Sequence, residues 1–109
     1  MRRAAFWTQA WYFMRGFSML KRARLTGGKK RVTFSLAAEE PAGPVSVVGD
    51  FNDWEPGRHE LKSRRNGTRS VSVILPAGEY RFRYLATGGV WLDDDTADKV
   101  DDEGSLLQV

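Results

Sequence analysis

The dominant pattern in this sequence is an alternation of hydrophobic and polar residues, which begins near residue 32 and is typical of half-buried β-strands. In the segment RVTFSL, Val32, Phe34 and Leu36 share one face. The segment SVSVIL repeats the alternation, and EYRFRYLA places three aromatic residues on one face against Arg81 and Arg83 on the other. The pattern therefore predicts strands that bury one face and expose the opposite one.

Seven such segments are separated by Gly, Pro and Asn residues, which favour turns. The segments are RVTFSL, PVSVVGDF, HELKSRR, SVSVIL, EYRFRYLA, GVWLD and LLQV. Asn66 and Gly67 connect the third segment to the fourth, and this dipeptide is a typical turn of a β-hairpin. The sequence thus predicts an all-β fold, an antiparallel β-sandwich of about seven strands.

The opening segment follows a helical period instead, with aromatic residues such as Trp7 and Trp11 on one stripe. Three interpretations stay open: an amphipathic membrane-surface or targeting helix, a helix packed on the domain, or sequence upstream of a natural start at Met19. A secretory signal fits poorly, because polar residues interrupt the apolar run and no A-x-A cleavage site follows. We favour the third interpretation and divide the chain into a segment 1–18 and a domain 19–109.

Composition narrows the class of protein. A chain of 109 residues with 41% hydrophobic residues is long enough for one domain with a modest core. No run of apolar residues is long enough to predict a membrane span. Cysteine is absent, which excludes disulfides, thiol nucleophiles and cysteine-bound zinc, and fits a reducing compartment such as the cytoplasm.

The net charge of +3 originates in the three arginines of segment 1–18, because from Met19 onward 14 basic residues balance 14 acidic ones. Basic residues gather between positions 21 and 31, and acidic residues between positions 93 and 103. Blocks of this kind are commonly solvated surfaces or partners of one another. A nucleic-acid module would combine a basic face with interleaved aromatic residues, so we predict no nucleic-acid partner.

Candidate catalytic groups are few. His59 is the only histidine, and its place after a Pro-Gly-Arg turn predicts a surface loop residue. Counted from Asp93, the acidic stretch has Asp98 where a helix-loop-helix calcium loop requires glycine, and Gly104 where it requires glutamate. No glycine pattern for phosphate binding occurs either. We therefore predict no enzyme, no cofactor and no metal site.

Two tryptophans are not explained by the strand pattern. Trp54 lies in GDFNDWEPG, whose composition predicts a loop, and Trp91 follows the Gly88-Gly89 turn. A loop tryptophan either caps an open end of the core or faces outward as a flat apolar platform for a ligand. The pattern by itself leaves both alternatives open for each tryptophan.

Three segments together, VSVVGDFNDW, LPAGEYRFRYLATGGVW and LLQV, resemble the family-48 carbohydrate-binding module. That module is similar to the N-terminal early-set domain of isoamylase and glycogen branching enzymes, and to the glycogen-binding domain of the AMP-activated protein kinase β subunit. The similarity runs from about Lys30 to Val109. It implies an immunoglobulin-like β-sandwich that binds α-1,4-linked glucans.

The resemblance also implies a site. Trp54 and Trp91 correspond to the two tryptophans on which the family stacks sugar rings, and Arg83 corresponds to a basic residue that contacts sugar hydroxyls. Asn52, within the F-N-x-W motif, and Ser105, in the last loop, are further candidate sugar contacts. Two flat indoles suit the apolar C–H face of a sugar ring, and a guanidinium fork suits its rim of hydroxyls.

The last loop departs from the family pattern. Asp101, Glu103 and Ser105 stand where the kinase domain carries a leucine, a threonine and an asparagine, and only Ser105 keeps a comparable hydrogen-bonding group. Two main hypotheses follow: a free-standing α-glucan-binding module, or a module of the same fold that docks a carbohydrate-active enzyme or other protein. A third is a membrane-surface protein, which requires that segment 1–18 forms a surface helix.

Overall fold

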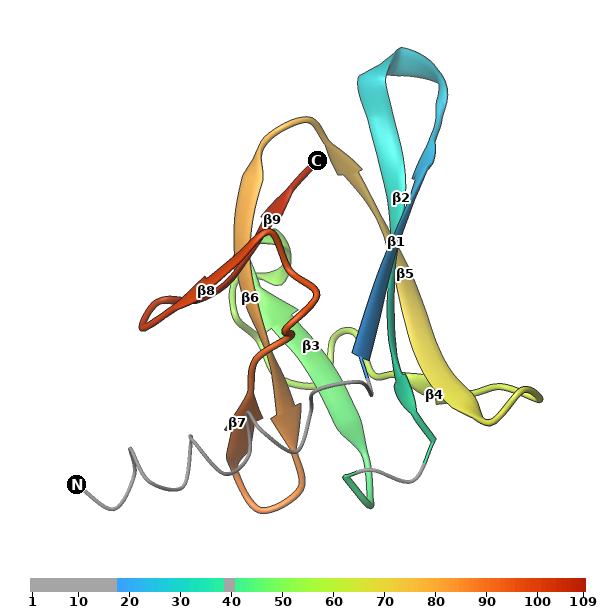
Figure 1. Cartoon of the computed structure of the whole chain (residues 1–109), viewed down its shortest axis with the longest axis vertical. Helices are drawn as coiled ribbons and strands as arrows, with labels where there is room; N and C mark the ends of the chain where they lie inside the picture. The colour runs from blue at the N-terminus through green and yellow to red at the C-terminus, as the bar shows by residue number, and fades with distance from the viewer. Residues whose placement is uncertain (1–17, 39–40) are drawn as a thin grey trace.

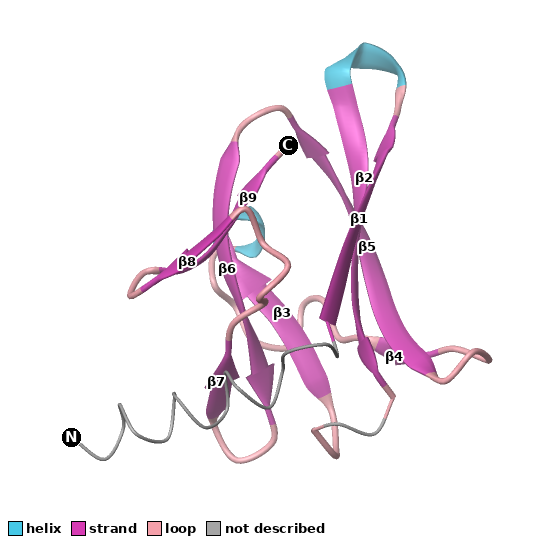
Figure 2. Cartoon of the chain, in the orientation of Figure 1, coloured by secondary structure: helices cyan, strands magenta, loops and turns pink. Residues whose placement is uncertain are grey.

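The computed structural model describes residues 18–38 and 41–109, which form two antiparallel β-sheets packed as two layers (Figures 1 and 2). The first sheet has the strand order β1-β2-β5-β4, and the second has the order β3-β6-β9-β8, with β7 paired to β6. The strands are β1 (Ser18–Arg24), β2 (Lys29–Ala37), β3 (Val45–Gly49), β4 (Lys62–Ser63), β5 (Thr68–Pro76), β6 (Glu79–Ala86), β7 (Val90–Leu92), β8 (Lys99–Asp101) and β9 (Gly104–Gln108). Two short 3-10 turns, η1 (Thr26–Gly28) and η2 (Asp50–Asn52), follow β1 and β3. The predicted all-β sandwich is confirmed.

The core lies between the two sheets and contains the alternating residues that the sequence predicts. Val32, Phe34 and Leu36 of β2 are at most 1% exposed, and Phe82 and Tyr84 of β6 face them fully buried. The rings of Phe34 and Phe82 meet edge to face, with centroids 5.1 Å apart. Each such aromatic pair contributes about 0.5–1.5 kcal/mol beyond the area that it buries. This contact therefore ties the second strand of one sheet to the central strand of the other.

The structure adds two strands to the seven that were predicted. β1 begins at Ser18, the last residue of the segment that the sequence separates from the domain, and pairs along its whole length with β2. The predicted helical segment otherwise lies outside the described residues. β8 lies within the acidic stretch and pairs with β9. Both strands lie at sheet edges and are held by their backbone pairing with β2 and β9.

A buried carboxylate joins the two layers. Asp94, which follows β7, is completely buried, and its oxygens accept hydrogen bonds from the hydroxyls of Ser18 at 2.9 Å and Tyr84 at 2.6 Å. The same carboxylate accepts bonds from the backbone N–H and the hydroxyl of Thr96. Burial, and then the charge and hydrogen bond of Asp94, raise the pKa of Tyr84 well above its usual value of 10.0. A buried carboxylate with four donors is a fully satisfied network of the kind that fixes one arrangement of a core.

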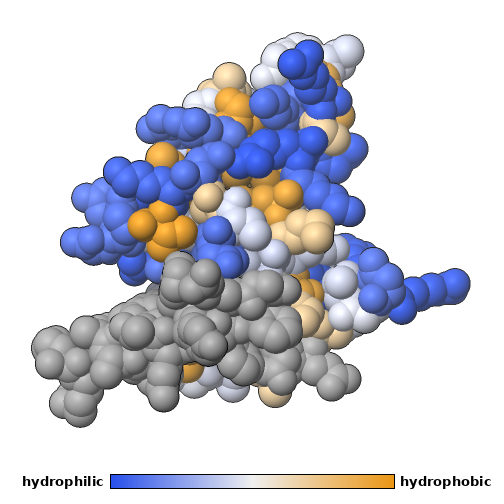
Figure 3. All heavy atoms as spheres, viewed as in Figure 1, coloured by the Kyte–Doolittle hydropathy of each residue, from blue (hydrophilic) through white to orange (hydrophobic). Residues whose placement is uncertain are grey.

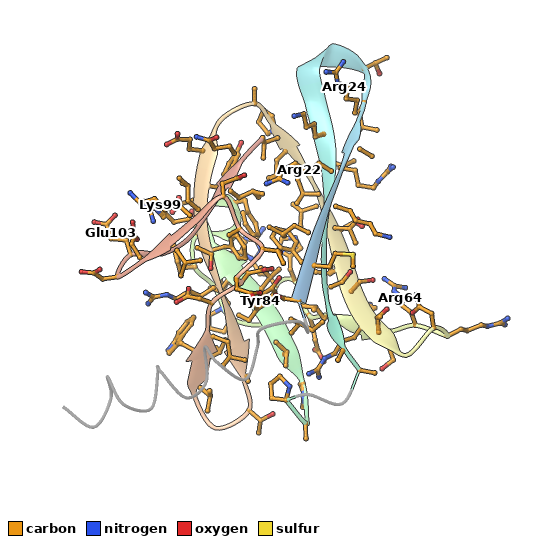
Figure 4. The ribbon with its side chains drawn as sticks, in the orientation of Figure 1. Arg22, Arg24, Arg64, Tyr84, Lys99 and Glu103 are labelled. Atoms are coloured by element: carbon orange, nitrogen blue, oxygen red, sulfur yellow. The ribbon has the colours of Figure 1, made fainter. Side chains whose placement is uncertain are left out.

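A second link closes the opposite end of the sandwich. The guanidinium of Arg22 in β1 donates to Asp98 at 2.8 Å and to the backbone oxygen of Gln108 in β9 at 3.2 Å. Figure 4 shows Arg22 reaching from β1 toward the second sheet. The expectation that the early basic block and the late acidic block partner one another holds for this pair. Among the described residues, no helix has the length and apolar character that crossing a membrane requires.

Candidate functional site

The loop that carries Trp54 begins where β3 ends, at Gly49. The backbones of β3 and β6 approach so closely here that a β-carbon on Gly49 would lie 2.4 Å from the carbonyl oxygen of Arg81. Only glycine fits such an approach. The chain then makes the short turn η2, and Asp53 and Trp54 follow with φ angles of +58° and +56°. This left-handed conformation costs a residue with a side chain about 1 kcal/mol or more.

Trp54 is held in this turn by its neighbours and remains partly open to solvent. Its side chain is among the exposed large hydrophobic groups, at 36%. The indole Nε1–H donates to Asp50 Oδ1 at 2.9 Å, and the backbone N–H of Trp54 donates to the carbonyl of Gly49. The second oxygen of Asp50 accepts the backbone N–H of Arg81 at 2.7 Å, beyond the end of β3. Asp50 therefore fixes the indole to the central strand of the second sheet.

Asn52 lies beneath this turn and not on its surface. Its side chain is 2% exposed; its oxygen accepts the N–H of Gly49 at 3.0 Å, and its nitrogen donates to the carbonyl of Val47 at 3.0 Å. The same nitrogen lies 2.9 Å from Nδ1 of His59. The amide thus shapes the loop from within, and a ligand on the outer surface does not reach it.

His59 is only partly exposed, and its ring packs edge to face against Phe51. Burial, and secondarily the charge of Arg58, lower the pKa of His59 below its usual value of 6.5. A neutral imidazole can accept the hydrogen bond that the Asn52 amide offers, whereas a proton on Nδ1 would remove that acceptor. The histidine therefore belongs to the support of the Trp54 loop.

Arg83 lies on the outer face of the second sheet, as the alternation predicts. Its Nε donates to Asp93 Oδ1 at 3.2 Å, and its terminal nitrogen donates to the backbone oxygen of Asp102 at 2.8 Å. The side chain lies across Gly104, whose β-carbon, if present, would be 3.2 Å from the Arg83 Nε. Two fixed donor bonds hold the guanidinium along the surface of the sheet.

Ser105 is completely buried and acts below Arg83. Its hydroxyl donates to Asp93 Oδ1 at 3.0 Å and accepts the backbone N–H of Asp94 at 2.9 Å. Burial raises the pKa of Asp93, and the charge of Arg83 and the Ser105 hydroxyl partly offset that rise. Ser105 therefore positions the carboxylate that positions Arg83, and it has no direct path to the surface.

Trp91 lies in β7, opposite Leu85 of β6, and shares the outer face with Arg83. Its side chain is partly exposed. β3 and β7 pair with opposite edges of β6. The loop with Trp54 follows β3, Trp91 lies in β7, and Arg83 belongs to β6, the strand between them. The structure thus places Arg83 and Trp91 on the outer face of the second sheet and Trp54, partly exposed, on the loop that follows β3, whereas Asn52 and Ser105 are buried.

The substituted last loop lies on the same outer face. Asp101 pairs with Arg81 at 2.7 Å, and Glu103 lies 3.9 Å from the same guanidinium.

The residues that sequence reasoning missed are Asp50 and Asp93, the two carboxylates that orient the indole of Trp54 and the guanidinium of Arg83. Asp50 carried a usable signal, since it stands four residues before Trp54 on a tight turn. Across 18–38 and 41–109, no group of three His, Asp or Glu side chains is arranged to hold a metal ion.

Comparison with known proteins gives a consistent result. Residues 31–109 match the family model described as the glycogen recognition site of AMP-activated protein kinase. A 1,4-alpha-glucan branching enzyme of Deinococcus radiodurans is 37% identical over 84 residues, which are 75% of this chain and 11% of the enzyme. The corresponding enzyme of Mesorhizobium japonicum is 41% identical over 69 residues, 60% of this chain and 9% of the enzyme. The chain spans about a tenth of the length of these relatives.

Proposed function

The chain belongs to the family of the glycogen recognition site of AMP-activated protein kinase, a non-catalytic carbohydrate-binding module, and we propose that it binds α-1,4-linked glucan through Trp54, Trp91 and Arg83. In this proposal the glucose units stack on the two indoles, and the guanidinium donates to the sugar hydroxyls. The proposed binding unit comprises strands β1 to β9, which correspond closely to the domain 19–109 expected from the sequence. We place the module in the cytoplasm, because a cysteine-free chain suits a reducing compartment.

The observation that carries the proposal is the conformation of Trp54. A large side chain sits at a left-handed position that glycine would occupy without strain, and a hydrogen bond to Asp50 holds its ring partly exposed. Strain of this kind persists where the surroundings impose it, and it clusters at ligand-binding sites.

The chemistry of the three residues suits a neutral sugar polymer. An indole offers a flat apolar surface to the C–H face of a glucose ring, and a pair of them can hold successive units of a chain. Arg83 enters with its orientation already set by Asp93 and the carbonyl of Asp102, so little side-chain freedom is lost on binding. Asn52 and Ser105 contribute by holding the two loops in place.

Isothermal titration calorimetry with maltoheptaose tests the proposal. We expect saturable binding of maltoheptaose, no binding of the β-1,4-linked cellohexaose, and little change between low and high salt, because a neutral ligand releases no counterions. The matched variants are Trp54→Ala, which should lose affinity, and Ile74→Ala, which changes an exposed residue of the other sheet and should not. Absence of binding at millimolar maltoheptaose would refute the proposal.

The second candidate is a module of the same fold that docks a carbohydrate-active enzyme. It is favoured by the ion pairs of Arg81 with Asp101 and Glu103, which put charge on the outer face where an apolar contact would help a sugar. The matching relatives also carry this region within a much longer chain. Binding of an α-glucan branching enzyme by a chain that ignores maltoheptaose would establish this candidate instead.

A further inference from the structure

The first sheet of the sandwich carries positive charge only. Its strands contain three lysines or arginines in β1, three in β2, and one in each of β4 and β5, with no aspartate or glutamate in any of them. The strands of the second sheet, by contrast, include Glu79 and Asp101. Figure 4 shows Arg24 and Arg64 at opposite ends of the first sheet, with Lys99 and Glu103 projecting from the other layer. The strands of the first sheet therefore carry basic residues only, whereas the strands of the second sheet carry both signs of charge.

The strand register places half of these cations on the outer face of the first sheet. Since Val32, Phe34 and Leu36 point into the core, Lys29 and Arg31 of β2 point outward. Lys21 lies opposite Thr33, and Lys62 lies opposite Ser70, both on that same outer side. We call the surface formed by Lys21, Lys29, Arg31 and Lys62 the basic face.

The cations of the basic face are not neutralised by ion pairs among the residues that the structure describes. Across residues 18–38 and 41–109, none of the four forms an ion pair, whereas Arg22, Arg58, Arg81, Arg83 and Lys99 all do. All four are exposed to solvent. Like charges gathered without counter-charges repel one another, so the basic face gains stability from any anionic surface that covers it.

Two exposed apolar side chains accompany the cations. Met19 and Ile74 are each 51% exposed; Ile74 lies opposite Arg31, and Met19 occupies the outward parity of β1. Between them the sheet carries small hydroxyl side chains, of which Thr33 and Ser72 lie 2.8 Å apart. Figure 3 shows hydrophilic side chains gathered on the β1–β2 hairpin and around the β4–β5 connection. The outer surface of the first sheet therefore combines cations with two exposed apolar groups.

We propose that the basic face docks the protein onto the surface of an anionic lipid bilayer. The outward positions of this sheet carry no aromatic residue on which a base could stack, and they include apolar side chains that a nucleic-acid backbone would not use. Lysine and arginine stems together with exposed Met19 and Ile74 suit the headgroup region, where a charged end and an apolar body are both accommodated. The residues that precede β1 in the sequence include Trp7 and Trp11 with three arginines and no acid, a composition that favours the same interface.

The proposed docking surface and the glucan site use opposite layers of the sandwich. Arg83 and Trp91 lie on the outer side of the second sheet, Trp54 lies on the loop that follows β3 of that sheet, and the basic face lies on the outer side of the first. A bilayer on the basic face therefore leaves the glucan site open to solvent. The docking proposal does not depend on glucan binding, and the two are tested separately.

Sedimentation of the full chain with vesicles tests the docking surface. The vesicles contain phosphatidylglycerol and phosphatidylcholine, and vesicles of phosphatidylcholine alone are the control. Each lysine or arginine near an anionic bilayer contributes about fivefold to partitioning, so the double variant Lys21→Gln/Arg31→Gln should bind roughly 25-fold more weakly. Ile74→Ser should weaken binding further, and high salt should abolish most of it.

A matched variant distinguishes the effect of the basic face from the effect of the net charge of the protein. Arg58→Gln/Lys99→Gln removes the same charge from outside the first sheet and should bind like the wild type. The proposal is overturned if the wild type does not bind the anionic vesicles, if both double variants lose affinity equally, or if Lys21→Gln/Arg31→Gln binds as well as the wild type. Tight binding of a short DNA duplex, lost in the Lys21→Gln/Arg31→Gln variant, with no vesicle binding would assign the face to nucleic acid instead.

Discussion

Replacing Trp54 by alanine separates the two roles that this side chain could have. As a stacking platform it should contribute about 1–3 kcal/mol to maltoheptaose binding, the range for aromatic stacking on a planar ring, which corresponds to a loss of roughly 5- to 150-fold in affinity. The cost in stability should be smaller than for a core aromatic residue. The ring is 36% exposed and makes one hydrogen bond, to Asp50, so we expect a loss of about 1–2 kcal/mol, against about 3–5 kcal/mol for a fully buried ring.

A glycine at the same position refines the test. Trp54 has a φ of +56°, and alanine there keeps the left-handed strain, which costs about 1–2 kcal/mol. Glycine relieves that strain but adds about 0.4–1 kcal/mol of conformational freedom to the unfolded chain. Trp54→Gly should therefore be more stable than Trp54→Ala by about 0.5–1 kcal/mol, while both variants lose the same binding energy.

Paired measurements on the wild type and both variants check this reasoning. Thermal unfolding gives the stability, with about 4–8 °C expected per kcal/mol in a domain of this size, and calorimetric titration with maltoheptaose gives the affinity. The platform assignment would be refuted if Trp54→Ala melted as low as a core truncation while the remaining folded protein bound normally. If glycine proved less stable than alanine, the strain argument would be wrong.

The remaining predictions concern three other side chains. Arg83→Gln should weaken maltoheptaose binding about tenfold or more, as expected for a lost hydrogen bond from a charged donor, whereas Arg65→Gln at an exposed hairpin turn should leave the titration curve unchanged. Tyr84→Phe should lower the free energy of unfolding by about 1.5–3 kcal/mol in urea titrations, because its hydroxyl donates to the buried Asp94 carboxylate; an unchanged midpoint would count against that network. For His59 the pKa is lowered in the folded state, so the unfolded chain takes up the proton first: stability should be full above pH 6.5 and decline as the pH falls below it, and His59→Gln should flatten this decline in melting curves.

The central strands could be predicted from the sequence because their alternation is imposed by burial. β2, β5 and β6 each have one face in the core, and a shift by one residue would expose Phe34 or Phe82. β1 could not be predicted in this way. Within SMLKRAR only Leu20 packs against the core, so the segment lacks an apolar alternation and is held by its pairing with β2. The same reason hides β8 among acidic residues.

The position of the candidate site and its exposed residues could be predicted, but the buried residues that support them could not. The turn composition around Trp54 indicated a loop, and the parity of β6 placed Arg83 outward. The direction of Asn52 and Ser105 could not be read from spacing, because side chains in a tight turn follow local φ angles and the contacts beneath them. Asp93 escaped notice for a related reason: a residue in an acidic block looks solvated until the fold buries it against Ser105.

The hydrogen bonds that join β1 to the second sheet can form only late in the synthesis of the chain. Ser18 and Arg22 bond to partners 76 residues later in the chain, so at roughly 5–20 residues per second about 4–15 s pass before those partners exist. The inner face of the β1–β2 hairpin gains cover earlier, as Phe51 and then Phe82 are made and reach Phe34, and the hairpin itself can already form. Its six cations repel the same hairpin on neighbouring nascent chains, which protects an open strand edge from pairing with another copy. The positive charge of the first sheet therefore also opposes aggregation of the nascent chain before the second sheet is complete.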